Sequence, residues 1–592
     1  MALQISTVHN QSFLKLHKPI TNLKTTHETS HEKYFFTQSM IFGDLHVALK
    51  ENFKHMKKTF LLALFSLSIA LQFSYAQGVL DQQNDPFFGE SCTSIMVGKK
   101  ATTDGSVITS HTCDGRYRTW LTMEKAQSFD KKATHKVYKG TLKTETAWDQ
   151  RKMILAGEIE EAESTFAYLN TAYPCLNEKQ LAIGETTIVG PKELVNEEGL
   201  FQIEELERIA LQRCTTARDA IKLIGELIKE HGYGDWGECI TIADKKEVWQ
   251  LEIFGEGPDK IGGVWAAQRI PDDHVGISAN ISRIGKIDLQ NPDYFMVSDN
   301  VFKAAKKLKR WDGEKEFKFW EVYGGVEKPF KIREFFVLNA FAPSLNLDFE
   351  ASELPFSVKP DSKISVNDVM AMYRETYEGT TYDMTQNLKV IKKKYNDDKE
   401  VIGQDTILAP NAHPWPTGNC RKVSNFLQKD AIEYQRTVAV SWCSYSFVTQ
   451  LRDWLPDEVG GVAWFSFDNP GQSPRIPIYS GASELPESFN YCGQKRFRED
   501  AAIWAYRKAN KLATLGWQST REEMMSDVAH FEAKGFEEGA ILENKISELI
   551  KEGKKDEART LLNQYTRDFA GSSMLRWKEL ENKYWGKFGL GF

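Results

Sequence analysis

The sequence lacks the short motifs that mark common metal and nucleotide sites. Residues 56–592 contain no H-E-x-x-H pair, and the 592-residue chain has no glycine-rich phosphate loop and no dinucleotide fingerprint placed between a strand and a following helix. Its eight cysteines are scattered and form no C-x-x-C pair, so neither a zinc pattern nor a compact disulfide framework is indicated. These absences favour chemistry that requires no metal or organic cofactor.

The chain also lacks a basic stripe. Its formal net charge is −7 and its pI is near 6.0, which argues against nucleic acid as a partner. The length permits a large buried core but leaves open several domains or one large domain with an appendage. The oligomeric state stays open, with a homo-oligomer among the possibilities.

The first 90 residues differ from the rest. Residues 1–55 hold six of the chain's 12 histidines and show no sustained periodicity, and we interpret them as an upstream over-extension or disordered leader. Residues 56–76, "MKKTFLLALFSLSIALQFSYA", combine a basic start, a short apolar stretch and a small-x-small ending, which predicts a secretory signal peptide. If translation begins at Met1, this segment becomes an internal signal or anchor.

Residues 77–91, "QGVLDQQNDPFFGES", are polar and contain Pro and Gly, which predicts an exposed pro-segment. Export would make the protein periplasmic or secreted, with no stable membrane span after processing. Residues 92–485 are predicted to form the main domain. Residues 486–592 are predicted to be a helical extension packed on that domain, because amphipathic, charge-rich runs replace the strand patterns there.

Strand patterns dominate the part of the chain that follows the pro-segment. We expect strands over residues 92–98, 106–112, 237–243, 247–253 and 274–279. Tight turns at 103–105 and 244–246 favour antiparallel pairing of the neighbouring strands. The run "TTARDAIKLIGELIKEHGYG" places apolar residues on one helical face and ends at Gly232. This mixture predicts an α+β fold in which helices cover sheets.

Cys92 begins the first of these strands. On position alone it could be a buried structural cysteine, since such cysteines behave as small hydrophobic residues. If cleavage leaves Cys92 at the N-terminus, however, its free α-amine, with a reference pKa of about 8, lies within reach of its own thiol. Nucleophile and base then belong to one residue. A papain-like pairing of Cys92 with His413 is disfavoured, because that chemistry places the cysteine at the start of a helix.

The stretch "CTSIMVGKKATTDGS", continuing to "SHTCDG", resembles the opening of the dipeptidase A and secernin family of cysteine N-terminal-nucleophile (Ntn) hydrolases. The likeness continues through "CLNEKQLAIGETT", "VWAAQRIPDDHVGISANISRI" and "LPDEVGGVAWFSFDNPGQSPRIPIYSG", and it spans roughly residues 92–510. The resemblance implies a four-layer αββα Ntn fold, self-processing that exposes the cysteine, and hydrolysis of dipeptides without a cofactor.

The resemblance also implies site residues. Cys92 matches the nucleophile, and Asp114 matches the acidic residue near the end of the second strand, where it would orient the amine and thiol. Asn177 and Asn280 resemble asparagines that in related amidases help to form the oxyanion hole and hold the amine. Arg436 is a weaker match to a late arginine of the superfamily.

One position departs from the family pattern. Many relatives carry an arginine three residues before the acidic residue, whereas this chain has His111 there. Arg116 or Arg118 could replace that charge only if the following loop folds back. This departure favours one alternative, an inactive secreted binding protein on the same fold. A second alternative is an Ntn acylase acting on non-peptide amides, because the same active site also serves such enzymes.

Overall fold

The computed structural model describes residues 91–592 except 147–148, 150–152, 259, 495 and 591–592. The predicted leader, signal peptide and all of the pro-segment but Ser91 lie outside the described residues. No helix in the described part of the chain combines the length and the apolar character that a membrane crossing needs.

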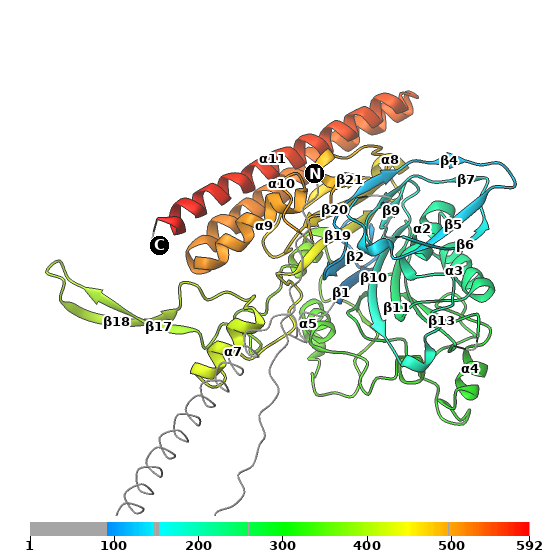
Figure 1. The fold of residues 1–592 in the computed structure, drawn as a ribbon, viewed down its shortest axis with the longest axis horizontal. Coiled ribbons are helices and arrows are strands. Elements are labelled where there is room, and N and C mark those ends of the chain that lie inside the picture. Colours follow the sequence, from blue (N-terminus) through cyan, green and yellow to red (C-terminus); the bar gives the residue numbers. More distant parts are fainter. Residues whose placement is uncertain (1–90, 147–148, 150–152, 259, 495, 591–592) are drawn as a thin grey trace, which may run out of the picture. The chain divides into compact units, whose positions relative to one another are not determined.

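Two large sheets form the centre of the described region (Figure 1). The seven-stranded sheet has the order β16 (Ser357–Val358), β14 (Val275–Ser278), β1 (Ser91–Val97), β2 (Val107–Asp114), β19 (Cys443–Leu451), β20 (Gly461–Phe467) and β21 (Ile476–Tyr479). The eight-stranded sheet has the order β15 (Phe295–Val297), β13 (Val264–Ile270), β12 (Val248–Phe254), β11 (Gly237–Ala243), β10 (Ala182–Val189), β9 (Leu176–Asn177), β8 (Tyr168–Asn170) and β3 (Thr122–Glu124).

The two sheets contact each other through β1 and β2 of the first and β10, β11 and β12 of the second. Gly184 on β10 permits this close approach, since a Cβ atom there would lie 2.4 Å from the main-chain oxygen of Ser110 on β2. Every residue of β2, β11, β12, β19 and β20 is buried, as expected for strands that are covered on both faces.

Helices contact both sheets. On the eight-stranded sheet, α2 (Ile203–Arg213) contacts β8 and β9, and α3 (Ala217–His231) contacts β11 and β12. On the seven-stranded sheet, α5 (Ile332–Phe341) contacts β14 and α6 (Val366–Met372) contacts β19. Three further helices are α4 (Val301–Lys307), α7 (Gly418–Leu427) and α8 (Asp457–Gly460).

The helix α3 shows why the sequence pattern was informative. Thr216 caps its start by accepting a hydrogen bond from the main chain of Asp219, and Gly232 ends it with a φ of 83°. Its apolar face, which includes Ile221, Ile224 and Ile228, is buried. The expected strands are also confirmed to within two residues at each end, and their neighbours pair antiparallel. The mixed architecture is therefore consistent with the predicted α+β class.

Residues 502–589 are almost entirely helical. They form α9 (Ala502–Ala513), α10 (Trp517–Lys551) and α11 (Lys555–Gly589), which lie along β20 and β21 (Figure 1). Phe531 of α10 and Trp577 of α11 belong to the same hydrophobic cluster as Phe465 of β20. These helices therefore share a core with the sheets.

Three two-stranded sheets lie outside the centre. They are β4 (Gln127–Ser128) with β7 (Ser164–Thr165), β5 (Thr134–Lys139) with β6 (Ile154–Glu160), and β17 (Lys389–Tyr395) with β18 (Val401–Leu408). The β17–β18 hairpin extends away from the two large sheets in Figure 1. All residues of β17 are exposed.

Candidate active site

Cys92 is the second residue of β1 and lies opposite Cys113 of β2. Its side chain is fully buried. Burial and, to a smaller extent, the neighbouring Glu185 carboxylate raise the pKa of the thiol well above its usual value. In the chain as described, with Ser91 still attached, the thiol is therefore protonated.

A side chain, rather than a neighbouring strand, binds the main-chain nitrogen of Cys92. This nitrogen donates to Oδ1 of Asn280 at 2.9 Å. Pairing of β1 with β14 begins two residues later, where Ser94 lies opposite Ser278. Asn280 follows β14 in a left-handed conformation with φ of 65°, which asparagine tolerates better than most residues. Its Nδ2 donates to the carbonyl of Thr187 at 2.8 Å, which fixes the orientation of the amide.

Asp114 and Arg436 form an ion pair beside Ser91. Asp114 lies opposite Ser91 in the strand register, and its Oδ2 accepts from Arg436 Nη2 at 2.6 Å. The same Arg436 nitrogen donates to the Ser91 hydroxyl at 2.7 Å. Thr112 also donates to Asp114, at 3.0 Å. The pair therefore adjoins the Ser91–Cys92 peptide bond.

Arg333 is a site residue that the sequence analysis missed. It projects from α5, and its guanidinium donates to the carbonyl oxygen of Cys92 at 2.5 Å and to Oδ1 of Asn280 at 2.8 Å. It also donates to the hydroxyl of Thr93 and the carbonyl of Ala279. Burial lowers its pKa to about 10, so it remains charged at neutral pH. Its motif-free surroundings, "KIREFF", offered no local signal.

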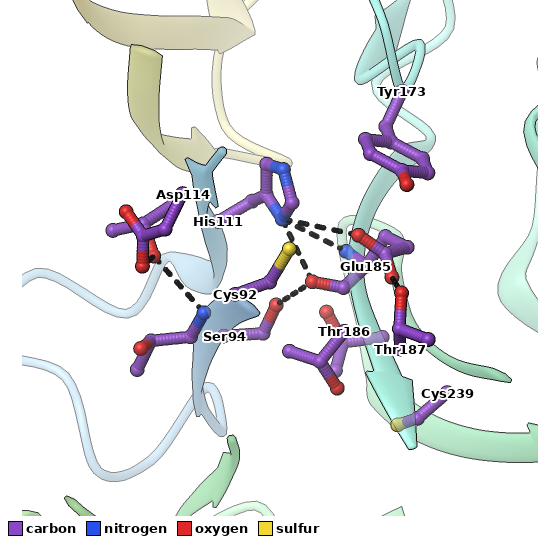
Figure 2. Close-up of polar contacts among 12 residues, drawn as sticks. Cys92, Ser94, His111, Asp114, Tyr173, Glu185, Thr186, Thr187 and Cys239 are labelled. Carbon is purple, nitrogen blue, oxygen red and sulfur yellow. Dashed lines mark hydrogen bonds and ion pairs between the residues drawn. The ribbon is translucent and has the colours of Figure 1, made fainter. Parts of the chain in front are cut away.

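His111 and Glu185 lie on the thiol side of Cys92 (Figure 2). The Cys92 sulfur, a His111 ring nitrogen and a Glu185 carboxylate oxygen lie within 4.8 Å of one another. His111 Nδ1 lies 2.7 Å from the main-chain oxygen and 3.3 Å from the main-chain nitrogen of Glu185, and we assign the hydrogen to Nδ1 because the contact with the oxygen is the shorter. Burial lowers the pKa of His111 to about 3, so the ring is neutral and does not supply the charge of an arginine.

Glu185 belongs to the free edge of β10. The short strand β9 pairs with β10 only near Ala182, and beyond this point Ser94 donates to the main-chain oxygen of Glu185 at 3.1 Å. Burial raises the pKa of the Glu185 carboxyl to about 7. The carboxyl is in hydrogen-bonding contact with Glu238 of β11, whose pKa is also raised by burial and by the charge of Glu185.

Four predicted or considered residues do not join this group through the hydrogen bonds of the described chain. Asn177 donates to the carbonyls of Leu211 and Cys214 and accepts from the main chain of Lys179 and Leu181, so its amide holds a turn against the end of α2. His413 accepts from the main chain of Trp415. Arg118 donates to the carbonyls of Thr171 and Ala172, and Arg116 is exposed.

Cys92, His111 and Glu185 are also residue types that bind metals, and their candidate atoms are close enough to share an ion. His111 Nδ1, however, is already engaged by the main chain of Glu185. We therefore assign no metal to this group. All eight cysteines lie in the described region as thiols without disulfide bonds.

A buried thiol at a strand start, together with an amide, a carboxylate and two arginines around its main chain, is a set of groups that a hydrolase with a cysteine nucleophile could use. Comparison with known proteins identifies the protein family. The model of peptidase family C69 matches residues 91–530. The chain belongs to this family and is a cysteine-type peptidase that hydrolyses peptide bonds, which confirms the resemblance recognised in the sequence.

Curated relatives carry consistent names. The chain is 26% identical to a "Probable dipeptidase" of Latilactobacillus sakei over 69% of this chain and 78% of that protein. It is 25% identical to a "Probable dipeptidase B" of Lactococcus lactis over 67% of this chain and 76% of that protein. It is 23% identical to a "Probable dipeptidase" of Salmonella dublin, over 66% and 81% of the two chains.

Proposed function

We propose that this protein is an exported dipeptidase whose nucleophile, the thiol of Cys92, becomes active when cleavage of the Ser91–Cys92 bond makes Cys92 the N-terminal residue. In this proposal the two facing sheets and their helices form a four-layer αββα Ntn fold. The names of the relatives support the choice of dipeptides as substrates. The sequence of residues 56–76 supports export.

One observation carries the proposal: the main-chain nitrogen of Cys92 donates its hydrogen bond to a side chain, that of Asn280, and not to a neighbouring strand. A nitrogen at a strand edge needs no more than a main-chain or water partner. Here Asn280 binds it, and Arg333 in turn binds Asn280. Such a site would hold the α-amine that processing exposes and keep it beside its own thiol.

The reaction then follows acyl-transfer chemistry. The Cys92 sulfur attacks the scissile carbonyl carbon, and its proton passes to the α-amine of the same residue. Asn280 Nδ2 has a second hydrogen besides the one given to Thr187, and this hydrogen would stabilise the oxyanion. The amine returns the proton to the leaving amino group. Water finally hydrolyses the thioester, with the amine again acting as base.

Self-processing would use the same groups. Attack of the Cys92 sulfur on the Ser91 carbonyl transfers the acyl group from nitrogen to sulfur, and water then releases the segment that ends at Ser91. Arg436 is positioned beside this bond through its contact with the Ser91 hydroxyl. The raised pKa of the buried thiol is consistent with a slow, dormant precursor.

The decisive experiment is N-terminal sequencing and intact-mass measurement of protein recovered from the exporting cell, alongside its Cys92→Ala variant. We expect the wild-type chain to begin at Cys92 and to hydrolyse dipeptides. The variant should keep the preceding segment and show no hydrolysis. An active Cys92→Ala protein would refute the proposed nucleophile, and an active wild-type chain that begins at Gln77 would refute the proposed processing.

A further inference from the structure

The thiol side of Cys92 contains buried acidic groups that the proposed reaction does not use. The side chain of Glu185 is fully buried and that of Glu238 is 3% exposed. Thr187 donates to Oε1 of Glu185 at 3.1 Å. Oε2 of Glu185 and Oε2 of Glu238 accept no hydrogen bond from an N–H or hydroxyl donor among the described residues.

Such groups are expensive in a protein interior. A buried carboxylate is stable when it is paired with a cation or receives several hydrogen bonds, and it otherwise remains protonated. Glu185 and Glu238 instead face each other, which raises the pKa of Glu238 further. Two buried carboxyls that face each other do not stabilise the folded state. Two adjoining carboxyls, each with one oxygen that accepts no hydrogen bond from the described residues, are, however, a suitable binding site for a cationic group.

The position of Glu185 relative to the nucleophile identifies the cation that would fit. In a dipeptide the α-ammonium nitrogen lies about 2.5 Å from the scissile carbonyl carbon, because a single Cα atom separates them. With a charge-assisted hydrogen bond of about 2.8 Å and an attack distance of about 3.2 Å, the carboxylate must lie within about 8.5 Å of the sulfur. A Glu185 oxygen lies within 4.8 Å of it.

We propose that Glu185, supported by Glu238, binds the α-ammonium group of the dipeptide and thereby restricts the enzyme to substrates with a free N-terminus. This inference rests on the proposed dipeptidase function. Figure 2 shows the Glu185 carboxylate on the side of β10 that faces Cys92 and His111. An ammonium held there would place the adjoining carbonyl carbon beside the thiol.

Binding of the ammonium would also affect the nucleophile. The carboxylates of Glu185 and Asp114 both disfavour the Cys92 thiolate, and neutral His111 does not compensate for them. A substrate ammonium on Glu185 offsets the nearer negative charge and lowers the pKa of the thiol. The free amino terminus would then increase kcat as well as affinity, and the substrate would supply the positive charge that His111 lacks.

The test uses two substrates that differ in one group: L-alanyl-L-alanine and propanoyl-L-alanine, which has the same scissile bond and no amino group. For the processed wild-type enzyme we expect kcat/KM to be at least about 100-fold higher for the dipeptide. In Glu185→Gln, which keeps the shape and removes the charge, kcat/KM for the dipeptide should fall about 10- to 100-fold. Its value for propanoyl-L-alanine should not fall, because loss of the Glu185 charge also removes one cause of the raised pKa of the thiol, so the preference for the dipeptide should decrease at least about 10-fold.

Glu207→Gln is the matched control. Glu207 lies on α2, is 1% exposed, and neither of its carboxylate oxygens has a hydrogen-bond partner in the described chain. This variant removes an equally buried carboxyl and should retain the wild-type preference. N-terminal sequencing and thermal unfolding of each variant verify processing and folding. If Glu185→Gln does not fold, Glu238→Gln provides the same comparison, with a smaller expected loss of preference.

The outcomes separate the two proposals. A wild-type enzyme that cleaves neither compound, or cleaves only acyl amides, overturns the dipeptidase function itself. A wild-type enzyme that prefers the dipeptide, with a Glu185→Gln variant that loses the same factor on both substrates, overturns the ammonium site alone. Loss of preference in the Glu207→Gln control would assign recognition to a different carboxyl and would also overturn it.

Discussion

The two sides of Cys92 differ in how completely their polar groups are satisfied. On the main-chain side, the nitrogen and the carbonyl oxygen of Cys92 are bound by Asn280 and Arg333, and Asp114 is paired with Arg436 through Oδ2, while its Oδ1 has no hydrogen-bond partner in the described structure. On the thiol side, Glu185 and Glu238 retain oxygens without a hydrogen-bond donor in the described structure. The groups on the main-chain side are thus held in place before a substrate binds. The carboxyls on the thiol side, in contrast, are complementary to the positive charge that we propose the substrate ammonium supplies.

The largest effect is expected from the main-chain side. Asp114→Asn removes the fully buried charge that pairs with the partly buried Arg436 and leaves that arginine without its carboxylate partner next to Cys92. Loss of one partner of a buried pair is strongly destabilising, and we expect kcat to fall about 100-fold or more. The measurement is steady-state hydrolysis of L-alanyl-L-alanine by protein of verified N-terminus.

Asp453→Asn is the control for this substitution, because it breaks the solvent-exposed Lys99–Asp453 pair. Exposed pairs contribute little, so its kcat should be unchanged. Wild-type activity in Asp114→Asn would contradict the view that the main-chain side is the preorganised half of the site.

Arg333→Met should destabilise the protein by at least about 3 kcal/mol. It removes the donor to the carbonyls of Cys92 and Ala279, which are buried and would lose this partner. Urea denaturation should show a lower midpoint at an unchanged slope. Arg333→Lys keeps the charge but not the forked geometry and should be intermediate. Equal stability of all three proteins would show that this side of the site does not depend on Arg333.

On the thiol side the expected effect depends on pH. The unfolded chain releases the Glu185 proton near pH 4.5, whereas burial raises the pKa of the folded state to about 7. The folded state therefore binds more protons between these values, and its stability falls as pH rises from about 4.5 to 7. Glu185→Gln removes this contribution, which amounts to up to about 3 kcal/mol.

The corresponding measurement is the free energy of unfolding of wild type and Glu185→Gln at pH 4.5 and pH 7.5, with the Glu207→Gln protein alongside. The stability advantage of Glu185→Gln over wild type should grow with pH. A constant difference between the two proteins would mean that Glu185 is as well satisfied as the groups on the main-chain side.

The smallest effect is expected for Cys113→Ala. Cys113 lies directly opposite Cys92 and is equally buried, so the substitution removes a second thiol from the same place in the sheet. We expect unchanged processing, activity within about twofold, and a loss of about 1 kcal/mol from the small cavity. If Cys113→Ala abolished hydrolysis, as we expect for Cys92→Ala, the assignment of the nucleophile to Cys92 alone would be wrong.

Local patterns in the sequence predicted the strands and much of the main-chain side. Cys92 lies at the start of β1 and Asp114 at the end of β2, and because these two antiparallel strands follow each other in the chain, their proximity follows from the register. Asn280 and Arg436 were carried by the family resemblance, and the structure brings both to the Ser91–Cys92 segment. Asn177 came from the same resemblance, but its amide is occupied by a turn, and its role in the reaction stays a prediction.

The missed residues share a physical reason. Arg333 reaches Cys92 across 241 positions of the chain from a helix whose sequence has no distinctive motif. Glu185 lies within a strand that has no distinctive motif, and its proposed role depends on where β9 ends and on its Oε2 having no hydrogen-bond partner among the described residues. A sequence shows which residues can bind a charge, but not which of them are left without a partner after folding.

Gly184 gives the site a mechanical constraint. It precedes Glu185, and the only atom it can present to the opposite sheet is hydrogen, because a carbon would collide with the main chain of Ser110. Any larger residue would force the two sheets apart and move β10, which carries Glu185, away from β2, which carries His111. Attempts to change the substrate range should therefore vary the side chains around Glu185 and Glu238 and keep Gly184, which sets the distance between the two sheets.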